Sequence, residues 1–576
     1  MPAKKEDNLE KEKFLAEIER LKKELKKRKK YGLVWEEKPE EVVEMCKSKL
    51  PVLKEVKNKE IITDPAKSVN LLIEGDNYHA LSVLNYTHAK KIDVIYIDPP
   101  YNTGAKDWKY NNNYVDGEDP YRHSKWLSFM NNRLRIAKNV LAPDGIICVT
   151  IDDYEIPRLW LLMEDIFGEI NHLGTVAIRI NPGGRKSKRK VAAQHEYALF
   201  FSKNANTSVA KILLDPEEKS HSYQKDKNGE WHEERNLRKE GADSLAKPGS
   251  ERYYPIYFDP ETGKISTKIK YKIKILPIDT SGKKRIWRRS KDVIDDICNN
   301  GDLFVKETKF GRQIYFKFKG GLEGETPKSF WSDAKYSASE HETQTLDSIL
   351  GERETFNFPK SPYATVDCIK VASSKKDAVV LDFFAGSGTT AHSVLLLNNE
   401  DGGNRQFILC TNNENDICTD VCYPRVEKAI RGYKNTKGEK VEGLGGNLKY
   451  FKTDFVDAEP TDKNKKKLTE QATEMLCIRE GTFEHVLPAR RSLGAGGEQK
   501  KFKIYKNNSH YTGIIFDQLA IPGFKKAIRD IKGKFSVYVF SLGDDTFDEE
   551  FEDIKQKVKL SPIPEAILRV YRRIFK

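Results

Sequence analysis

Two short segments of the chain combine residue types that could do chemistry. The first, residues 94–104 (VIYIDPPYNTG), places Asp98 and Tyr101 on either side of Pro99 and Pro100, directly after an apolar run. The prolines fix the backbone and remove two N–H donors, so an acidic side chain, unopposed carbonyl oxygens and an aromatic ring remain. These groups suit a planar substrate that offers N–H donors and can stack. An ordinary proline-containing turn is the alternative for four residues taken alone.

The second segment, residues 381–390 (LDFFAGSGTT), is typical of a strand end followed by the start of a helix. Its FxGxG pattern consists of Phe384, Gly386 and Gly388, and glycines let a ligand approach the backbone closely. The helix N-terminus offers free N–H groups to a carboxylate or phosphate. A dinucleotide-binding turn also fits, but Gly388 is not followed by the spacing of GxGxxG, which counts against NAD or FAD.

The elements around both segments predict an α/β domain with a mostly parallel sheet. Residues 92–97 and 379–384 are apolar runs of strand length, and each leads into one of the two segments. Helical patterns such as residues 127–141 alternate with them, as in a parallel sheet. Ligands bind beyond the carboxyl ends of such strands, which is where both segments lie. Further strand-like runs are residues 71–73, 146–151, 197–201 and 407–410.

The length of 576 residues predicts several domains, because one domain usually holds roughly 100–200 residues. A helical stripe is expected within residues 7–30, and a Lys-rich linker at 464–467. The predicted parts are an N-terminal helical region (1–65), a sheet domain in two pieces (66–205 and 356–455), an insert (206–355) and a C-terminal α+β region (456–576).

The chain is basic, with a formal net charge of +13, and the excess is uneven. Residues 211–320 contain 25 Lys and Arg against 18 Asp and Glu. Clustered positive charge mixed with aromatic residues is typical of a polyanion binder, although a solvated surface is the common alternative. The candidate DNA-binding residues form two runs: Arg185, Lys186, Lys188 and Arg189, and Lys283, Lys284, Arg285, Arg288 and Arg289 around Trp287.

Other signals narrow the class of protein. The charged first residues lack an apolar stretch, so we expect no secretory signal. No run approaches roughly 18 apolar residues, so a membrane span is not expected. The eight scattered cysteines favour buried reduced thiols over a zinc site, and we predict no metal. Together these signals favour a cytoplasmic protein. The P-loop pattern GxxxxGK[ST] is also missing.

The two motifs together resemble the S-adenosylmethionine-dependent amino-methyltransferases of DNA. DPPY before FxGxG, with a large insert between them, is similar to the β class, which implies a circularly permuted Rossmann-like sheet. Finer matches resemble the modification (Mod) subunit of type III restriction–modification systems. They are KYGLVWEEKPE (30–40), LLIEGDN (71–77), DPPYNTG (98–104), FPKSPY (358–363), DFFAGSGTTAHSV (382–394) and residues 399–430.

The resemblance implies methyl transfer to adenine N6 of a base flipped out of double-stranded DNA. Asp98 would accept one N6 hydrogen, the Pro99 carbonyl the other, and Tyr101 would stack on the base. The insert would be the target-recognition domain, with its basic residues on phosphates. The implied cofactor-binding residues are Asp76 for the cofactor adenine, Asp98, Lys360 for its carboxylate, Asp382, Phe384, Gly386 and Gly388 beside its methionine part, and Glu414 for the ribose.

Three alternatives stay open at this point. One is N4-cytosine methylation, the same chemistry on another exocyclic amine. The second is a catalytically silent DNA-recognition subunit, and the third a nicotinamide oxidoreductase. The resemblance also implies a homodimer and a separate restriction (Res) subunit, an ATPase and nuclease, as partner.

Overall fold

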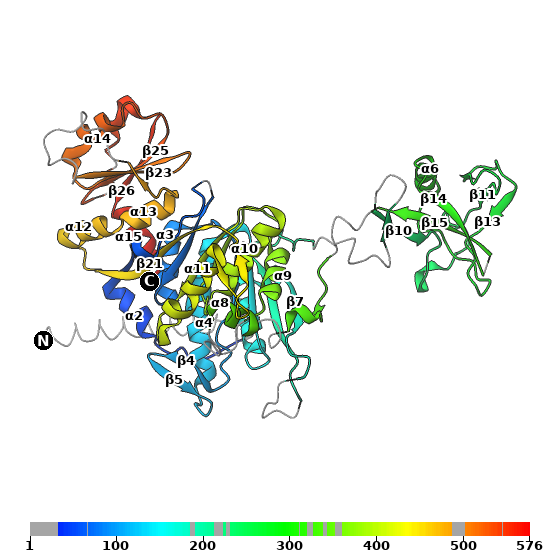
Figure 1. Ribbon diagram of the computed structural model, residues 1–576, viewed down its shortest axis with the longest axis horizontal. Helices are drawn as coiled ribbons and strands as arrows, with labels where there is room; N and C mark the ends of the chain where they lie inside the picture. Colours follow the sequence, from blue (N-terminus) through cyan, green and yellow to red (C-terminus); the bar gives the residue numbers. More distant parts are fainter. Residues whose placement is uncertain are drawn as a thin grey trace, which may run out of the picture. The chain divides into compact units, whose positions relative to one another are not determined.

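The computed structural model divides the chain into two compact units, residues 1–210 with 328–576, and residues 211–327 (Figure 1). The predicted helix in 7–30 and the basic run 185–190 lie outside the described residues. The structure describes residues 33–65, 67–184, 191–211, 223–225, 231–309, 311–319, 326–337, 343–351, 360–486, 501–543, 545 and 547–575.

A ten-stranded sheet forms the centre of the larger unit. From β21 to β6 the neighbouring strands are parallel, while β1 and β8 run antiparallel to their neighbours, so the predicted α/β class with a mostly parallel sheet is confirmed. The strand order is β1 (Lys49–Glu55), β21 (Asn447–Asp457), β2 (Val69–Glu74), β18 (Gln406–Thr411), β17 (Val379–Asp382), β3 (Ile92–Ile97), β6 (Leu141–Ile151), β8 (His195–Ser202), β7 (His172–Arg179) and β16 (Phe330–Trp331).

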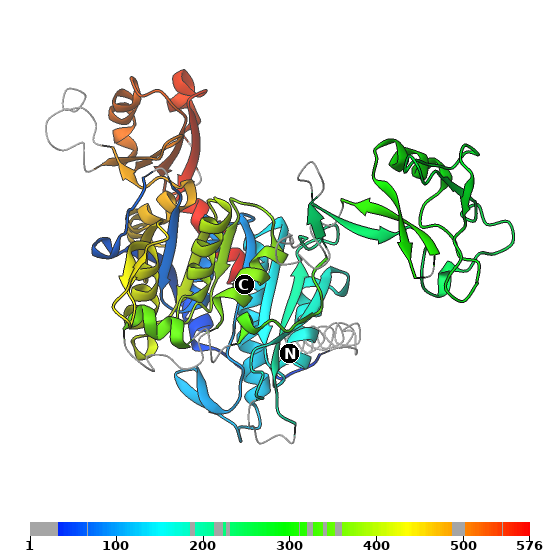
Figure 2. The ribbon, with the colours of Figure 1, turned by 45° about the vertical axis from the view of Figure 1, so that its right-hand side comes forward.

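Helices cover both faces of this sheet, which explains why its central strands are apolar runs and not alternating patterns. Helix α10 packs between α9 and α11, in front of the sheet in Figure 2, while α4 packs between α3 and α5. The bounds are α3 (Asn77–Thr87), α4 (Arg122–Val140), α5 (Ile156–Phe167), α9 (Pro362–Ala372), α10 (Thr389–Asp401) and α11 (Tyr423–Arg431).

Smaller elements complete the larger unit. In its C-terminal part, Tyr571 of α15 donates to the Pro51 carbonyl of β1 at 2.5 Å, which joins this part to the sheet. These elements are α2 (Glu41–Ser48), the hairpin β4 (Ala105–Tyr110) and β5 (Asn113–Asp116), α8 (Thr343–Leu350), β19 (Gly432–Lys434) with β20 (Lys440–Glu442), α12 (Asp462–Gln471), α13 (Thr473–Glu480), the sheet β22 (Glu484–His485), β23 (Phe502–Lys506), β24 (Tyr511–Ile515), β25 (Phe535–Phe540) and β26 (Val558–Ile563), α14 (Ile521–Ile528) and α15 (Glu565–Ile574).

The smaller unit has its own core around Trp287, Ile294 and Ile314. It lies within the predicted insert 206–355, whose later elements β16 and α8 belong to the larger unit. Its elements are a four-stranded sheet, β14 (Leu303–Thr308), β15 (Gly311–Phe318), β10 (Trp231–Asn236) and β9 (Tyr223–Lys225), a three-stranded sheet, β12 (Ile265–Ser266), β11 (Ile256–Phe258) and β13 (Ile273–Ile275), and helix α6 (Lys291–Asn299).

Two local expectations were wrong. Residues 49–55, predicted to be part of a helical region, form strand β1, because β21 pairs with them along their whole length. Residues 464–467, predicted to be a linker, belong to helix α12, because Thr461 caps the N-terminus and Leu468 is buried. The lysines form the solvated face of that helix.

Gly75, between β2 and Asp76, gives a test of this packing. Its φ is +152°, and a Cβ there would lie 2.1 Å from Oγ1 of Thr453. We expect Gly75→Ala to destabilise the protein by about 1–3 kcal/mol, measured as a shift of the urea unfolding midpoint. Gly402→Ala is the control, because Gly402 has φ +66° and open space among the described residues. Its cost should be backbone strain alone, about 1 kcal/mol; equal effects would contradict the packing.

Candidate active site

The two motifs meet because their strands are neighbours. Strand β17 pairs in parallel with β3, with Val380 opposite Val94 and Leu381 opposite Ile95. The residues that follow both strands therefore lie at the same carboxyl edge of the sheet. On the other side of β17, the ends of β18 and β2 bring Glu414 and Asp76 to this edge.

Asp98 follows β3, and its contacts all lie on one carboxylate oxygen. Its Oδ1 accepts from Thr150 Oγ1 at 2.8 Å and from Tyr101 Oη at 2.8 Å, and Lys360 Nζ lies 3.3 Å from it. Among the described residues, no hydrogen bond ends on Oδ2, and the closest approach of Lys360 is to Oδ1. The side chain is 25% exposed. Oδ2 is thus left as an acceptor for an incoming N–H group.

Charges around Asp98 act on its acidity in opposite directions. Burial raises the pKa of this carboxyl, Lys360 lowers it, and Glu196 raises it again. Hydrogen bonds from Thr150 and Tyr101 favour the ionised form. The balance of two carboxylates around one ammonium therefore controls the ionisation of Asp98 and the strength with which it accepts a hydrogen bond.

Tyr101 is held by both carboxylates. Its hydroxyl lies 2.8 Å from Asp98 Oδ1 and 2.9 Å from Oε2 of Glu196, and burial raises the pKa of this phenol well above its usual range. Lys360 contacts the same hydroxyl and lies 4.6 Å from the ring centroid. These contacts fix the orientation of the ring, and its stacking on a base stays a prediction.

The turn after Asp98 is held in place by hydrogen bonds to buried side chains. Pro99 is buried, and the Pro100 carbonyl accepts from Trp126 Nε1 at 2.7 Å. Asn102 is fully buried with φ +57°, and its Nδ2 donates to Glu155 Oε1 at 2.6 Å. Pro100, predicted among the catalytic residues, therefore shapes the turn through its carbonyl.

The FxGxG loop is held in shape by its own acid. Asp382 is 3% exposed; its Oδ1 accepts from the Phe384 amide at 2.9 Å and its Oδ2 from Thr390 Oγ1 at 2.5 Å. Burial raises the pKa of Asp382 to about 7. Gly386 and Gly388 have φ of +48° and +80°, a conformation that suits glycine. Asp382 positions the loop, and a direct contact with a cofactor stays a prediction.

Asp76 caps helix α3 at the end of β2. It accepts from the Tyr78 amide at 2.7 Å, and its Oδ2 lies 3.4 Å from an Arg133 nitrogen. Arg133 is completely buried and pairs with Glu40 at 2.7 Å. The carboxylate of Asp76 is 29% exposed and thus reaches the edge of the sheet.

Glu414, predicted for the ribose, forms an ion pair with Lys109 of the β4–β5 hairpin. The two side chains are 32% and 28% exposed. This pair connects the hairpin that follows the DPPY turn to the segment that follows β18. The predicted ribose contact stays a prediction, and it would compete with Lys109 for the same carboxylate.

Sequence reasoning missed Glu196 of β8, which is 2% exposed. It contacts Tyr101 and forms an ion pair with Lys360. The ammonium of Lys360 contacts Asp98, Tyr101 and Glu196, and its predicted contact with a cofactor carboxylate stays a prediction. A signal was available, because Glu196 stands beside an apolar run (YALFF) where an unpaired charge would be costly.

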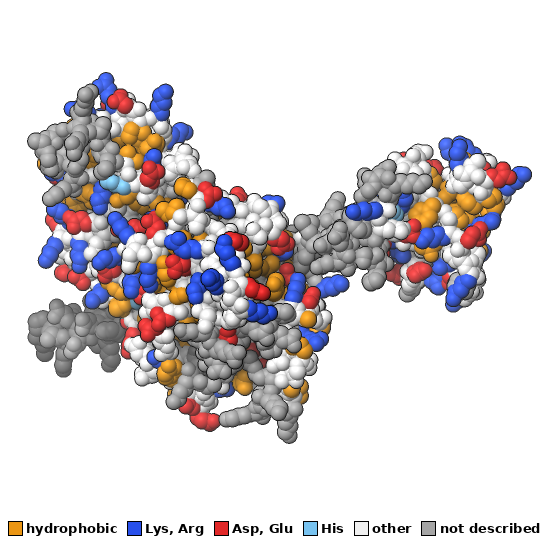
Figure 3. Space-filling view, viewed as in Figure 1, with side chains coloured by type: hydrophobic (Ala, Val, Ile, Leu, Met, Phe, Trp, Pro, Cys, Tyr) orange, Lys and Arg blue, Asp and Glu red, His pale blue; other side chains and the backbone are white. Residues whose placement is uncertain are grey.

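The basic run of the smaller unit separates into two kinds of residue. Lys283, Lys284 and Arg289 are exposed, and Arg288 is exposed with its Nε donating to the Asn236 carbonyl. Figure 3 shows several Lys and Arg side chains on the visible face of this unit. Arg285 is instead held by Asp279 at 2.7 Å. Arg285 therefore belongs to the architecture of the unit, while the lysines are free to approach a polyanion.

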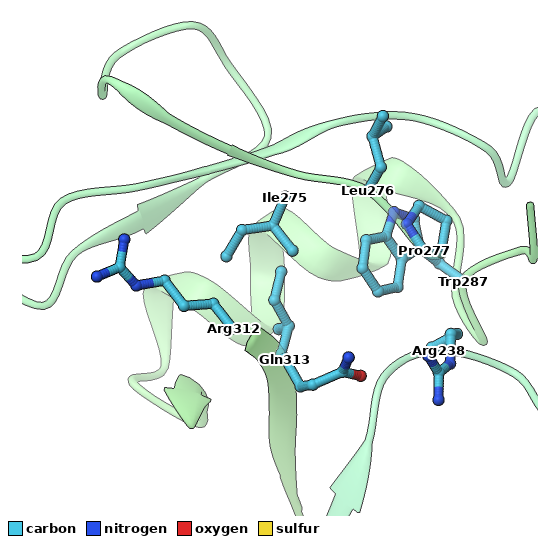
Figure 4. Close-up of a pocket in the computed structure, with 8 residues that line it drawn as sticks. Arg238, Ile275, Leu276, Pro277, Trp287, Arg312 and Gln313 are labelled. Atoms are coloured by element: carbon cyan, nitrogen blue, oxygen red, sulfur yellow. The ribbon is translucent and has the colours of Figure 1, made fainter. Parts of the chain in front are cut away.

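A small hollow in this unit is lined by three polar side chains, from Arg238, Arg312 and Gln313, and by apolar residues (Figure 4). Arg312 and Gln313 lie at the start of β15, and Gln313 accepts from Asn236 Nδ2 at 3.1 Å. Arg238 is 8% exposed and donates to the Ile278 carbonyl. Trp287 forms an apolar wall beside them. Such groups are of the kinds that contact nucleic acids.

Two findings concern metals and membranes. Within the described ranges, no group of three or more His, Cys, Asp or Glu is placed to hold a metal ion. Cys418 and Cys422, the closest cysteine pair in the sequence, are both buried. None of the helices in the described part of the chain has the length and apolar character needed to span a membrane.

Comparison with known proteins decides the family. Residues 92–421, more than half of the chain, match the family model described as DNA methylase. The chain belongs to the DNA methylase family. Both motifs lie inside the matched region. The methylase is 33% identical to the type II methyltransferase M.KpnI of Klebsiella pneumoniae, over 70% of this chain and 94% of that protein.

A second relative is the Mod subunit of the type III restriction-modification enzyme EcoPI of Escherichia phage P1. It is 32% identical over 60% of this chain and 58% of the Mod subunit, so the methylase matches little more than half of that protein. Among solved structures, a putative DNA modification methylase of Thermus thermophilus complexed with S-adenosyl-L-methionine is 12% identical, covering 66% of this chain and 99% of that one, with a TM-score of 0.30.

Asn102 tests how the DPPY turn is held. Asn102→Gly keeps the left-handed backbone. It removes the hydrogen bond that Asn102 Nδ2 donates to Glu155 and the one that Asn102 Oδ1 accepts from Trp108 Nε1 at 3.1 Å. We expect a loss of about 1–3 kcal/mol in thermal unfolding, because Glu155 is left buried with fewer partners. Asn102→Ala adds backbone strain and should cost about 1 kcal/mol more. A glycine variant as stable as the parent protein would show that these bonds do not hold the turn.

Proposed function

We propose that this methylase transfers a methyl group from S-adenosylmethionine to adenine N6 and serves as the modification subunit of a type III restriction–modification system. The observation that supports the chemistry is Asp98, whose Oδ2 is left open at the end of β3 while Oδ1 is fixed by Thr150, Tyr101 and Lys360. Family membership supports DNA as the substrate.

The groups at the sheet edge fit S-adenosylmethionine. Asp76 and Asp98 offer carboxylates to amines and to a sulfonium charge, and the N-terminus of α10 offers N–H groups to a carboxylate. Gly388 lets the start of α10 pack closely against the segment that leads into α11, since a Cβ there would lie 3.1 Å from Cys422 Sγ. When bound, the cofactor supplies an electrophilic methyl group.

The chain's own residues prepare the acceptor. Adenine N6 is a weak nucleophile because its lone pair is delocalised into the ring. Asp98 Oδ2 and the Pro99 carbonyl would each accept one N6 hydrogen, which favours a pyramidal nitrogen with an available lone pair. Tyr101, held by two carboxylates, would stack on the flipped base. The rate would come from positioning and oriented acceptors.

A type II methyltransferase that acts alone is the second candidate. It is favoured by the match to M.KpnI, because this chain covers 94% of that protein but only 58% of the EcoPI Mod subunit. The type III proposal is supported by several Mod relatives. It is also supported by the Mod-like sequence segments on both sides of the insert, such as residues 71–77 and 382–394. It brings with it a homodimer and a Res partner, which co-purification of the two subunits would test.

Methyl transfer is the first test. We expect the parent protein, given labelled S-adenosylmethionine and unmethylated genomic DNA, to produce N6-methyladenine at one short motif, mapped by single-molecule sequencing. Asp98→Asn should lose transfer by roughly a hundredfold or more, because the amide offers N–H groups where an acceptor is needed. Methylation of one strand supports type III, and methylation of both strands of a palindrome supports type II.

Other outcomes would overturn parts of the proposal. Label on cytosine would retain the fold and change the base. Binding of cofactor and DNA without transfer would favour a silent recognition subunit. Loss of cofactor binding in Asp98→Asn, measured by calorimetry, would account for the loss of transfer at the cofactor and would remove this support for a role of Asp98 on the base.

The smaller unit gives a separate prediction about DNA. Lys283→Ala with Lys284→Ala should weaken DNA binding and reduce the slope of log K against log salt by about one to two, because each lost phosphate contact contributes about 0.9. Lys268→Ala with Lys270→Ala, two other exposed lysines of the unit, is the matched control. Equal effects of the two pairs would indicate general charge attraction and no defined phosphate contact.

A further inference from the structure

Glu196 is a buried carboxylate in the site for which the proposed mechanism has no use. It reaches the site from β8, whose register places Tyr197 opposite Ile151 at the end of β6. Its Oε2 lies 2.9 Å from Tyr101 Oη and forms an ion pair with Lys360. Two carboxylates, Asp98 and Glu196, therefore share one ammonium and one phenol.

The sharing has a geometric consequence for Asp98. Lys360 lies on the Oδ1 side of Asp98, at 3.3 Å, and its closer partner is Glu196. A lysine side chain is long and flexible. Glu196 draws the ammonium away from Asp98, and its loss would favour a shift of the ammonium toward Oδ2, the oxygen left for the substrate amine. The single proton of the Tyr101 hydroxyl can likewise serve one carboxylate at a time.

We propose that Glu196 is a positioning residue for methyl transfer, which holds the Lys360 ammonium and the Tyr101 hydroxyl so that Asp98 Oδ2 stays open to the target amine. This inference rests on the proposed function of Asp98. Glu196 touches neither substrate nor cofactor in this account. It acts through Lys360 and Tyr101.

Charges facing Asp98 from every side determine the pH dependence. They are Lys360 from the segment before α9, Glu196 from β8, Tyr101 from the same turn and Asp382 from β17, with the Thr150 hydroxyl from β6. Transfer needs ionised Asp98, so the rate falls as the pH drops through its pKa. An anion nearby raises that pKa and a cation lowers it.

Two variants should therefore shift the acid limb of the pH–rate profile for methyl transfer in opposite directions. Glu196→Gln removes an anion, so the limb should shift to lower pH by about one unit, while Lys360→Met removes the cation and should shift it to higher pH by a similar amount. In Glu196→Gln the rate above the limb should also fall, roughly tenfold to a hundredfold, because the ammonium moves onto Asp98. The Michaelis constant for S-adenosylmethionine should change little in this variant.

Glu196→Asp is the conservative control, because it keeps the charge on a shorter side chain. It should keep the acid limb of the parent protein and recover part of the rate. A readout without cofactor or DNA is the infrared carboxyl band of protein labelled with ¹³C-aspartate. The band that disappears in Asp98→Asn reports the protonation of Asp98, and its midpoint should move as the acid limb does.

These measurements separate the inference from the function on which it depends. If the parent protein transfers no methyl group, the proposed function fails, while the infrared shifts still test the charge network. Parent-like rate and limb in Glu196→Gln would overturn the inference. So would shifts of both variants in the same direction, or a rate loss with no shift, since either result would indicate a purely structural role.

Discussion

The parallel pairing of β17 with β3 is the constraint on which the site depends. Four side-chain positions, Asp98, Tyr101, Asp382 and Phe384, come from distant parts of the sequence, and this one strand pair places them at a single edge. The helices that connect the strands pack on the two faces and leave that edge free. The residues between the two motifs can therefore hold a whole second unit, with its own core, without disturbing the register of the sheet.

Carboxylates gather at this edge, and each needs compensation because burying an ion costs free energy. Asp382 is compensated on both oxygens by the loop it holds. Asp76 caps a helix and faces Arg133. Asp98 is compensated on one oxygen. Asp382 and Asp98 differ in this respect: the buried Asp382, with both oxygens engaged, can shape a loop, while Asp98, with one oxygen to spare, can accept from a substrate.

Local signals predicted most of the sheet and both motifs. Apolar runs such as residues 92–97 indicate central strands of a sheet that helices cover on both faces. Motifs at the ends of such strands are then expected at the ligand-binding edge. What local signals could not supply was pairing over long distances. Strand β1 forms by pairing with β21, which comes near the end of the sheet domain in the chain. The role of Glu196 likewise follows from its ion pair with Lys360. The run of lysines at 464–467 was likewise compatible with a linker and with the solvent-exposed face of α12, because composition alone does not show that Leu468 is buried.

The DPPY turn connects the proposed base site to the proposed cofactor site. On one side, Asp98 and Tyr101 share contacts with Lys360 and Glu196. On the other, the chain leaves the turn through the buried Asn102 and enters the β4–β5 hairpin, whose Lys109 pairs with Glu414 after β18. A ligand that draws Glu414 away from Lys109 would release the hairpin at one end, while Asn102 keeps the other end fixed. In the proposed reaction, the anchored turn would let the cofactor side adjust without moving Asp98, as a reaction that depends on precise acceptor geometry requires.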